Sequence, residues 1–362
     1  NKKDRLLWMH CASLGEFEQG RPIIEKLKSQ QPQLKILLTF FSPSGYEIRK
    51  NYEQADYVFY LPMDTRKNAR HFLEIAQPDI AIFVKYEFWY HYLHELKRQR
   101  IPAYLISAIF HSRQPFFSSF YGKFFQSILH CFQFLFVQNK NSAKLLQSID
   151  IQHFEVVGDT RVDRVLQVAK TVRTFSKIEQ FKGYAPLLIC GSTWPPDEAI
   201  LCPYINQDQS NWKYIFAPHD ISENHLQQLE AELQVSYQRY SNFQANPSTK
   251  VLIIDNIGLL SQIYQYGKVA YIGGDFGTGI HNTLEPAAFS LPVLFGSKYE
   301  KFEEAVSLVN QKGAFVVSNF SEFEYHFQAL QEEKTYQNAS MQVKAYLRAN
   351  GGATERILKL IC

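Results

Sequence analysis

The first motif that could do chemistry centres on a glutamate directly after an apolar run. Ser13-Leu14-Gly15-Glu16 leads from that run into a helical pattern. Glu16 is therefore expected at the carboxyl edge of a sheet, beside the free N–H groups of a helix start. A carboxylate there can cap the helix, or it can act as a general base. The spacing alone leaves both roles open.

A glycine-rich segment indicates a second kind of chemistry, the binding of an anion. Four glycines lie in the seven residues 273–279, after an apolar run and before a short helical pattern. Glycine lets the backbone approach a phosphate closely and direct its N–H groups at it. Glu285 lies a turn into the helix, where its carboxylate can accept two hydrogen bonds from a ribose diol.

The same segment has two other interpretations. His281 and Glu285 are spaced i, i+4, as in metal-ligand pairs on helices. We expect no metal, because no third ligand lies nearby in the sequence and the glycines favour a phosphate. A tight turn capped by Asn282 is the purely structural alternative, but it explains poorly why so many glycines cluster.

Four other motifs also follow apolar runs and open helical patterns. They are Phe41–Gly45, Gly191-Ser192-Thr193, Ala217-Pro218-His219-Asp220 and Ile257-Gly258-Leu259. Hydroxyls and backbone N–H groups at helix starts suit an anionic ligand, and capping is the alternative for each. None of them is a Walker loop or a G-x-G-x-x-G turn, so the sequence indicates neither P-loop chemistry nor a dinucleotide.

The elements that must position these motifs alternate between apolar runs and helical periods. Helices are predicted at 22–30, 65–76 and 88–100 in the first half of the chain. Strands are predicted at 6–10, 35–40, 57–61, 80–85, 103–110 and 134–138, and then at 187–190, 214–217, 251–254, 269–272 and 293–295. Such alternation predicts α/β architecture, with mostly parallel sheets covered on both faces. Ligands of these sheets bind at the carboxyl ends of the strands.

The two series of strands predict two doubly wound domains that face each other across a cleft. We place the first at residues 1–172 and the second at 173–335, with a polar linker at 174–185. Residues 336–362 are predicted as one or two helices interrupted at Gly351-Gly352. We expect these helices to return to the first domain.

Composition excludes several classes of protein. The chain has 362 residues, of which 46% are hydrophobic and 20% charged, and its net charge is +3. Such values are normal for a folded domain and do not indicate a nucleic-acid binder. The sequence contains no run of about 18 apolar residues, so it does not indicate a membrane span. The five cysteines form no C-x-x-C pair, so we expect buried thiols in a reducing compartment.

An aromatic and basic stretch at residues 110–125 has two interpretations. Phe116, Phe117, Phe120, Phe124 and Phe125 are interleaved with arginine and lysine. This pattern suits a membrane interface, whereas a helix with a wide core face is the alternative. The chain begins without an initiator methionine, just before an apolar strand. We therefore expect an N-terminal segment to precede it.

Together these motifs resemble the Kdo transferases, the 3-deoxy-D-manno-octulosonic acid transferases of lipopolysaccharide biosynthesis. The order and spacing agree from about residue 6 to the C-terminus. The resemblance rests on Ser13–Phe17, Phe41–Gly45, 60–64, 87–89, 157–163, 191–194, 217–219 and 279–285. It implies the GT-B fold, in which two Rossmann-like domains form the enzyme.

The resemblance also implies a reaction, in which Kdo moves from CMP-Kdo to a hydroxyl of the tetraacyl lipid A precursor, lipid IVA, with inversion. Glu16 matches the family's general base. No cofactor or metal is implied, and the enzyme is expected at the cytoplasmic face of the bacterial inner membrane, held by an N-terminal anchor. The matching donor contacts are Ser192, Thr193, Pro218, His219, Ile257, Gly258, Leu259, Gly274, His281, Asn282, Thr283, Leu284 and Glu285.

Three positions depart from the family pattern. Lys85 replaces the first carboxylate of the Glu-x-Glu-Leu-Trp motif, Ile109 replaces an arginine, and Ile280 replaces a glycine of the loop. Acceptor and phosphate contacts at these positions are therefore expected to differ. Two other functions stay open, namely a GT-B enzyme that uses a UDP-sugar and a non-catalytic lipid-binding relative.

Overall fold

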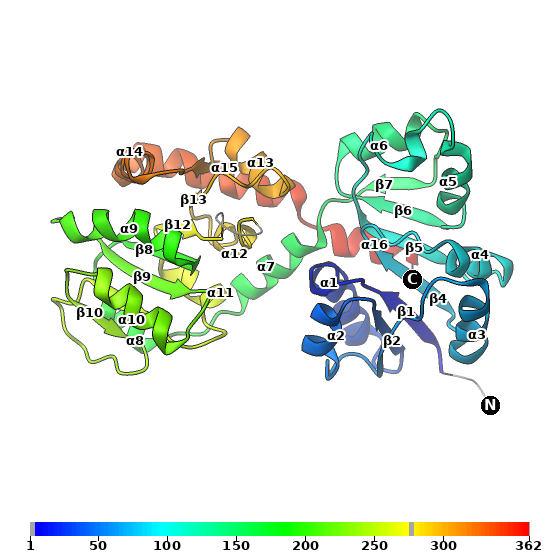
Figure 1. Ribbon diagram of the computed structural model, residues 1–362, viewed down its shortest axis with the longest axis horizontal. Coiled ribbons are helices and arrows are strands. Elements are labelled where there is room, and N and C mark those ends of the chain that lie inside the picture. Colours follow the sequence, from blue (N-terminus) through cyan, green and yellow to red (C-terminus); the bar gives the residue numbers. More distant parts are fainter. Residues whose placement is uncertain (1–3, 275–278, 362) are drawn as a thin grey trace. The chain divides into compact units, whose positions relative to one another are not determined.

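The computed structural model describes residues 4–274 and 279–361 of the chain. The chain divides into two compact units. One comprises Asn1–Arg164 with Asn350–Cys362, and the other comprises Val165–Ala349. Each unit has its own parallel sheet with helices on both sides (Figure 1).

The first unit is built on a seven-stranded sheet of order β3-β2-β1-β4-β5-β6-β7. The order reverses between β1 and β4, so this is where the fold places a ligand. The strands are β1 (Leu6–His10), β2 (Lys35–Phe40), β3 (Tyr57–Tyr60), β4 (Ile80–Val84), β5 (Ala103–Ala108), β6 (Phe134–Val137) and β7 (Phe154–Val156). The helices are α1 (Leu14–Gln30), α2 (Pro43–Arg49), α3 (Arg66–Ala76), α4 (Tyr90–Arg98), α5 (Gly122–Leu129), α6 (Lys140–Gln147) and α16 (Ala353–Ile361), with a 3₁₀ turn at Pro115–Phe117.

The second unit repeats this plan with the strand order β10-β11-β9-β8-β12-β13-β14, which reverses between β8 and β12. Its strands are β8 (Leu187–Thr193), β9 (Lys213–Pro218), β10 (Tyr237–Arg239), β11 (Val251–Ile253), β12 (Val269–Ile272), β13 (Val293–Phe295) and β14 (Ala314–Val316). Its helices are α8 (Ser176–Lys182), α9 (Pro195–Gln207), α10 (Glu223–Glu232), α11 (Leu260–Ile263), α12 (Leu284–Ala287), α13 (Glu303–Asn310), α14 (Phe320–Gln331) and α15 (Glu333–Asn350), with a 3₁₀ turn at Tyr264–Tyr266.

Continuous apolar strands are typical of parallel sheets that helices cover on both faces. The residues of β4 and β5 are all buried, as expected of strands with helices on both faces. In the first unit, separate clusters form on the two faces of the sheet, one around Trp8 and Phe83 and the other around Met9 and Phe17. The predicted α/β class and its two doubly wound sheets are therefore confirmed.

Two predicted elements are wrong in extent. The helix predicted over 22–30 begins at Leu14, because a capping box of Ser13 and Glu16 starts it directly after β1 and Pro22 is tolerated inside. The polar stretch 174–185, predicted as a linker, contains α8. Ile178 and Phe181 lie three residues apart on that helix and are buried, which gives it an apolar face.

The connections between the units follow helices rather than loops. Helix α7 (Thr160–Lys170) contains the boundary at Arg164 and Val165, whereas the sequence predicts it at residue 172, near the end of a helical pattern. The boundary near the C-terminus lies at residues 349 and 350 instead of 335, since α15 belongs to the second unit. The predicted break at Gly351-Gly352 is confirmed, and α16 packs on the cluster around Met9 through Ile357 and Leu358.

Four of the five cysteines lie within the described residues. Cys11, Cys131, Cys190 and Cys202 are free and buried, and burial raises the pKa of each thiol. Cys362 lies outside the described residues. Within them, no helix combines the length and apolar composition that crossing a bilayer requires.

Candidate functional site

Glu16 lies in the first turn of α1, after the carboxyl end of β1. Its Oε2 accepts a hydrogen bond from the Ser13 N–H (3.0 Å) and another from the Ser13 hydroxyl. Capping is thus a real role of this residue. Its other oxygen, Oε1, makes no hydrogen bond to the residues the structure describes, and the side chain is partly exposed. One oxygen therefore holds the turn while the other can take a proton.

The fold brings the Phe41–Gly45 motif beside the Glu16 turn. The N–H groups of Phe41 and Ser42 both donate to the carbonyl of Ala12. A Cβ at Gly45 would clash with the Phe40 ring and lie 3.0 Å from the Ser13 carbonyl carbon, so this close approach favours glycine. Ser42 itself accepts from the Ser44 N–H and caps α2.

A buried network that the sequence analysis missed lies at the same sheet edge. Trp8 Nε1 donates to Thr39 Oγ1 (2.8 Å), and His10 Nδ1 lies 2.9 Å from that oxygen. Glu87 Oε2 lies 3.1 Å from His10 Nε2 and accepts from Trp89 Nε1 (2.6 Å). A carboxylate oxygen accepts, so His10 Nε2–H donates to Glu87, and in the neutral histidine Nδ1 then accepts from the Thr39 hydroxyl. The motif at residues 87–89 indicated Glu87 and Trp89, but nothing in the local pattern joined them to His10.

In the second unit, three aromatic rings stack at the strand ends. The ring centroids of Trp194 and His219 are 4.7 Å apart, and those of His219 and His281 are 4.5 Å apart. Trp194 Nε1 also donates to His281 Nε2 (3.4 Å). Burial lowers the pKa of His281, and neighbouring His219 lowers it further, so His281 is neutral at pH 7 and can accept this bond.

The glycine segment is described up to Gly274 and again from Gly279, and Asp275–Thr278, including Gly277, lies outside the described residues. Gly274 has φ of +108°, a conformation that favours glycine. A Cβ there would lie 2.7 Å from the ring of His281. The His281 N–H donates to the Gly273 carbonyl (3.1 Å). Gly274 and His281 are therefore brought together.

The residues after His281 form a short capped helix. Asn282 Oδ1 accepts from the Leu284 N–H, and its amide donates to Glu285 Oε1 (3.1 Å). Thr283 and Leu284 are buried, whereas Asn282 is exposed and Glu285 partly exposed. Asn282 thus holds the turn that leads into α12, as in the structural alternative for this segment.

The remaining predicted donor contacts lie at the ends of β8, β9 and β11. Ser192 has φ of +54°, an uncommon conformation for serine. The hydroxyl of Thr193 is buried and donates to Glu198, and Pro218 is buried at the end of β9. Ile257 and Gly258 are exposed and Leu259 partly so, at the start of α11. Leu260 of that helix packs against Gly191, which brings this loop beside β8.

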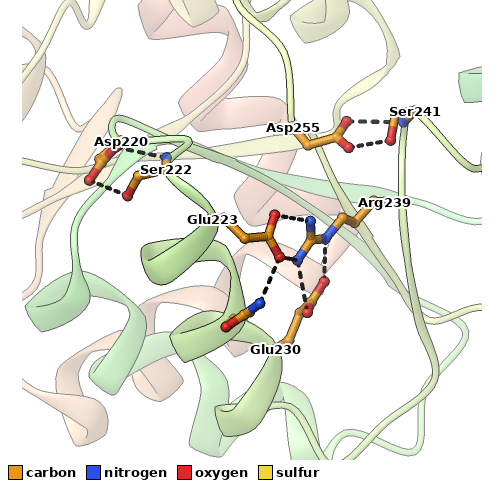
Figure 2. Close-up of polar contacts among 8 residues, drawn as sticks. Asp220, Ser222, Glu223, Glu230, Arg239, Ser241 and Asp255 are labelled. Atoms are coloured by element: carbon orange, nitrogen blue, oxygen red, sulfur yellow. Dashed lines mark hydrogen bonds and ion pairs between the residues drawn. The ribbon is translucent and has the colours of Figure 1, made fainter.

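Polar contacts anchor the loops that follow β9 and β11 (Figure 2). Asp220 accepts from the N–H and hydroxyl of Ser222, just before α10. Asp255 holds the N–H and hydroxyl of Ser241 in the same way. Asp220 therefore orders the turn before α10 by holding Ser222, the residue at the N-cap of that helix. These contacts fix the chain directly after His219 and directly before Ile257.

The structure gives no support to a metal pair. His281 precedes α12, which begins only at Leu284, so the i, i+4 spacing does not place both side chains on one helix. Among residues 4–274 and 279–361, no group of three His, Cys, Asp or Glu side chains could hold a metal ion.

The aromatic stretch at 110–125 divides into core and surface. Phe110 and Phe116 are buried and pack against Phe88. Phe120 is 95% exposed and Phe124 57% exposed, and Lys123 between them is also exposed. The membrane interpretation therefore applies only to the part after residue 119.

Comparison with known proteins identifies the family. A family described as 3-deoxy-D-manno-octulosonic-acid transferase (kdotransferase) matches residues 1–164. The 3-deoxy-D-manno-octulosonic acid transferase of Aquifex aeolicus is 27% identical over 322 residues, or 87% of this chain and 83% of that protein. The Haemophilus influenzae transferase of the same name is 26% identical over 378 residues, or 98% and 86%. Residues 1–164 thus match the Kdo transferase family, and similarity to proteins of that name extends over most of the chain.

Two solved structures of other proteins share the fold of this chain. The UDP-GlcNAc 2-epimerase of Neisseria meningitidis has a TM-score of 0.67 at 14% identity, and 99% of each chain is covered. MurG of Acinetobacter baumannii has a TM-score of 0.63 at 12% identity, again with 99% of each chain covered. These likenesses show the GT-B fold. The match to proteins named as Kdo transferases makes this chain a glycosyltransferase.

The three departures from the Kdo transferase pattern have distinct surroundings. Lys85 has φ of +70°, and its ammonium lies over the ring of Tyr86. Ile109 is 9% exposed and Ile280 is 3% exposed. Both isoleucines thus bury apolar side chains where the family pattern has an arginine and a glycine.

Proposed function

We propose that this protein transfers Kdo from CMP-Kdo to a hydroxyl of the tetraacyl lipid A precursor, with inversion and with Glu16 as general base. The observation that carries the proposal is the carboxylate of Glu16, fixed through one oxygen and unbonded among the described residues at the other. The family match supplies the reaction class.

Inversion needs one displacement. The acceptor oxygen attacks the anomeric carbon of Kdo, the bond from that carbon to the CMP phosphate oxygen breaks, and the acceptor proton passes to Glu16. The hydrogen bonds from Ser13 orient the carboxylate before the reaction. A base with its geometry preset needs no reorganisation as charge develops.

The donor is proposed to bind at the strand ends of the second unit. CMP leaves with a single phosphate, and backbone N–H groups with nearby imidazoles can stabilise that charge without a metal or cofactor. Gly274, His219 and His281 form the described part of such a site. The ribose hydroxyls are assigned to Glu285, which is partly exposed beside Asn282.

We also propose that the protein works at the cytoplasmic face of the inner membrane, where its lipid acceptor is found. Phe120, Tyr121 and Phe124 are exposed around Lys123 on the first unit. Aromatic side chains beside a cation suit the interfacial region of a bilayer.

A transfer assay with CMP-Kdo and the tetraacyl precursor tests the reaction and the base. Glu16→Gln retains an oxygen to accept from Ser13 but cannot take the proton. Turnover is expected to fall about 10²–10⁴-fold, while CMP binding and the melting temperature stay close to wild type. Glu18→Gln is the matched control, because Glu18 lies on the same helix and pairs with Arg21 and Arg49.

Each outcome has a distinct meaning. Full turnover by Glu16→Gln would remove Glu16 as the base and leave the reaction in place. A wild-type protein that binds UDP in preference to CMP would replace the donor. Binding of CMP without transfer to any lipid acceptor would overturn the proposed activity itself.

A further inference from the structure

Two consecutive buried carboxylates in the second unit have no part in the mechanism above. Asp197 and Glu198 lie in the first turn of α9, and their exposed fractions are 0% and 1%. Burying a carboxylate is costly unless hydrogen bonds compensate for the lost water. The partners of these two side chains therefore indicate what the two residues are for.

Asp197 links the end of β8 to the glycine turn after β12. Its Oδ2 accepts from the N–H groups of Trp194 (2.9 Å) and Gly274 (3.2 Å), while Oδ1 accepts from the Tyr271 hydroxyl (2.9 Å). A Cβ on Gly273 would lie 2.7 Å from Oδ2, so the glycine turn packs directly on this carboxylate.

Glu198 links β8 to the loop after β9. It accepts from the Thr193 hydroxyl (2.8 Å), and its other oxygen lies 2.9 Å from His225 Nε2. His225 Nδ1 lies 2.8 Å from the Asp220 carbonyl. A carbonyl only accepts, so His225 Nδ1 donates its proton to the Asp220 carbonyl. The contact between His225 Nε2 and the Glu198 oxygen needs a second proton, which one of these two atoms carries.

The strand ends joined in this way are those that carry the proposed donor contacts. Asp197 holds Trp194, whose ring stacks on His219, and it holds Gly274, which packs against His281. Glu198 holds Thr193 directly and the loop after His219 through His225. Ordinary helix capping would account for the bond to Trp194 alone.

We propose that Asp197 and Glu198 are positioning residues that set the geometry of the nucleotide-phosphate site by tying the ends of β8, β9 and β12 to one helix turn. They touch no substrate. The inference rests on the proposed donor site, and it assigns the preorganisation of that site to hydrogen bonds rather than to the charge of the two carboxylates.

The test compares variants that break these bonds with variants that keep them. Asp197→Ala and Glu198→Ala each remove a hub of hydrogen bonds, and the Kd of CMP measured by calorimetry is expected to rise about tenfold or more. Asp197→Asn can still accept from the two N–H groups. Glu198→Gln can accept from Thr193 and donate to His225. Both conservative variants should stay within about threefold of wild type.

Asp208→Ala is the matched control. Asp208 follows the opposite end of α9 and is also largely buried, and it accepts from the Tyr214 and Ser210 hydroxyls and pairs with Lys250. This variant should lower the melting temperature comparably without changing the Kd of CMP. Equal changes in Kd for Asp197→Ala and Asp208→Ala would overturn the proposal, since the effect would then be general destabilisation.

Two further measurements cover the remaining outcomes. If an alanine variant does not fold, Tyr271→Phe removes one bond to Asp197 and should still weaken CMP binding about threefold; an unchanged Kd would count against the role. Exchange of the Gly274 amide proton, followed by NMR without ligand, should accelerate in the Asp197 variant alone. Unaltered exchange would contradict the inference even if the donor proved to be another nucleotide.

Discussion

Single residues at the proposed donor site differ in how much their neighbours constrain them. Gly274 and Gly258 both have positive φ, at +108° and +94°. A Cβ on Gly274 would meet the ring of His281 and the Gly279 carbonyl, whereas a Cβ on Gly258 would meet nothing within 4 Å. At Gly258, the backbone conformation alone favours glycine. At Gly274, both the conformation and the packing against His281 require it.

Gly258 and Gly274 give a prediction about single residues. Gly258→Ala should lower the free energy of unfolding by about 1–2 kcal/mol for backbone strain alone. Gly274→Ala should cost clearly more, because the methyl group must also displace His281. Chemical denaturation of the two variants measures the difference. Equal losses would mean that the glycine turn yields to the methyl group without cost.

At the scale of elements, one side chain fastens the last helix to the first unit. Asp163 accepts from the N–H groups of Gly352 (2.6 Å) and Thr354 (2.7 Å), at the start of α16. Arg356 on that helix donates to the carbonyls of Val156 and Val157. The cap on α16 thus comes from α7, which is far away in the sequence.

Removing this cap should destabilise the first unit. Asp163→Ala leaves two N–H groups without their acceptor and is expected to cost about 1–2 kcal/mol of unfolding free energy. Glu355→Gln is the control, since Glu355 forms an exposed ion pair with Lys26, worth less than about 1 kcal/mol. Thermal unfolding measures the stability of both variants. A loss of stability in Asp163→Ala no larger than in Glu355→Gln would contradict the capping role of Asp163.

At the scale of the whole molecule, the proposed association with a membrane is assigned to apolar side chains that the fold leaves exposed. A Phe120→Ser/Phe124→Ser variant should bind vesicles of phosphatidylethanolamine and phosphatidylglycerol at least about tenfold more weakly, because each phenylalanine is worth about 1.5–3 kcal/mol when buried. Sedimentation with vesicles measures this. The control, Tyr184→Ser, removes a fully exposed aromatic of the second unit and should have no effect.

Phe116 is unsuited to that test, although the aromatic pattern includes it. It is 4% exposed and packs against Phe88 and Phe110. A charge there would disrupt the core instead of a membrane surface. Vesicle binding that survives loss of Phe120 and Phe124 would place the lipid contact elsewhere on the protein.

Local patterns in the sequence determined the strands and the motifs that follow them. Long apolar runs such as Leu6–His10 and Val269–Ile272 match observed strands end to end. The strands without a prediction are β7, β10 and β14, each three residues long. The equally short β11 and β13 are apolar and fully buried, whereas these three contain partly exposed residues. No continuous apolar run marks them, so pairing with a neighbour decides whether they form.

The partners of the functional side chains were decided only by the tertiary structure. Glu16 finds Ser13 three residues away, so its capping role could be predicted from spacing. His10 and Glu87 are 77 residues apart, as are Asp197 and Gly274. Such pairs meet because parallel strands bring their carboxyl ends to one edge in an order that reverses next to the first strand of each sheet. Neighbouring residues in the chain do not encode that order, so these contacts arise only when the whole sheet has formed.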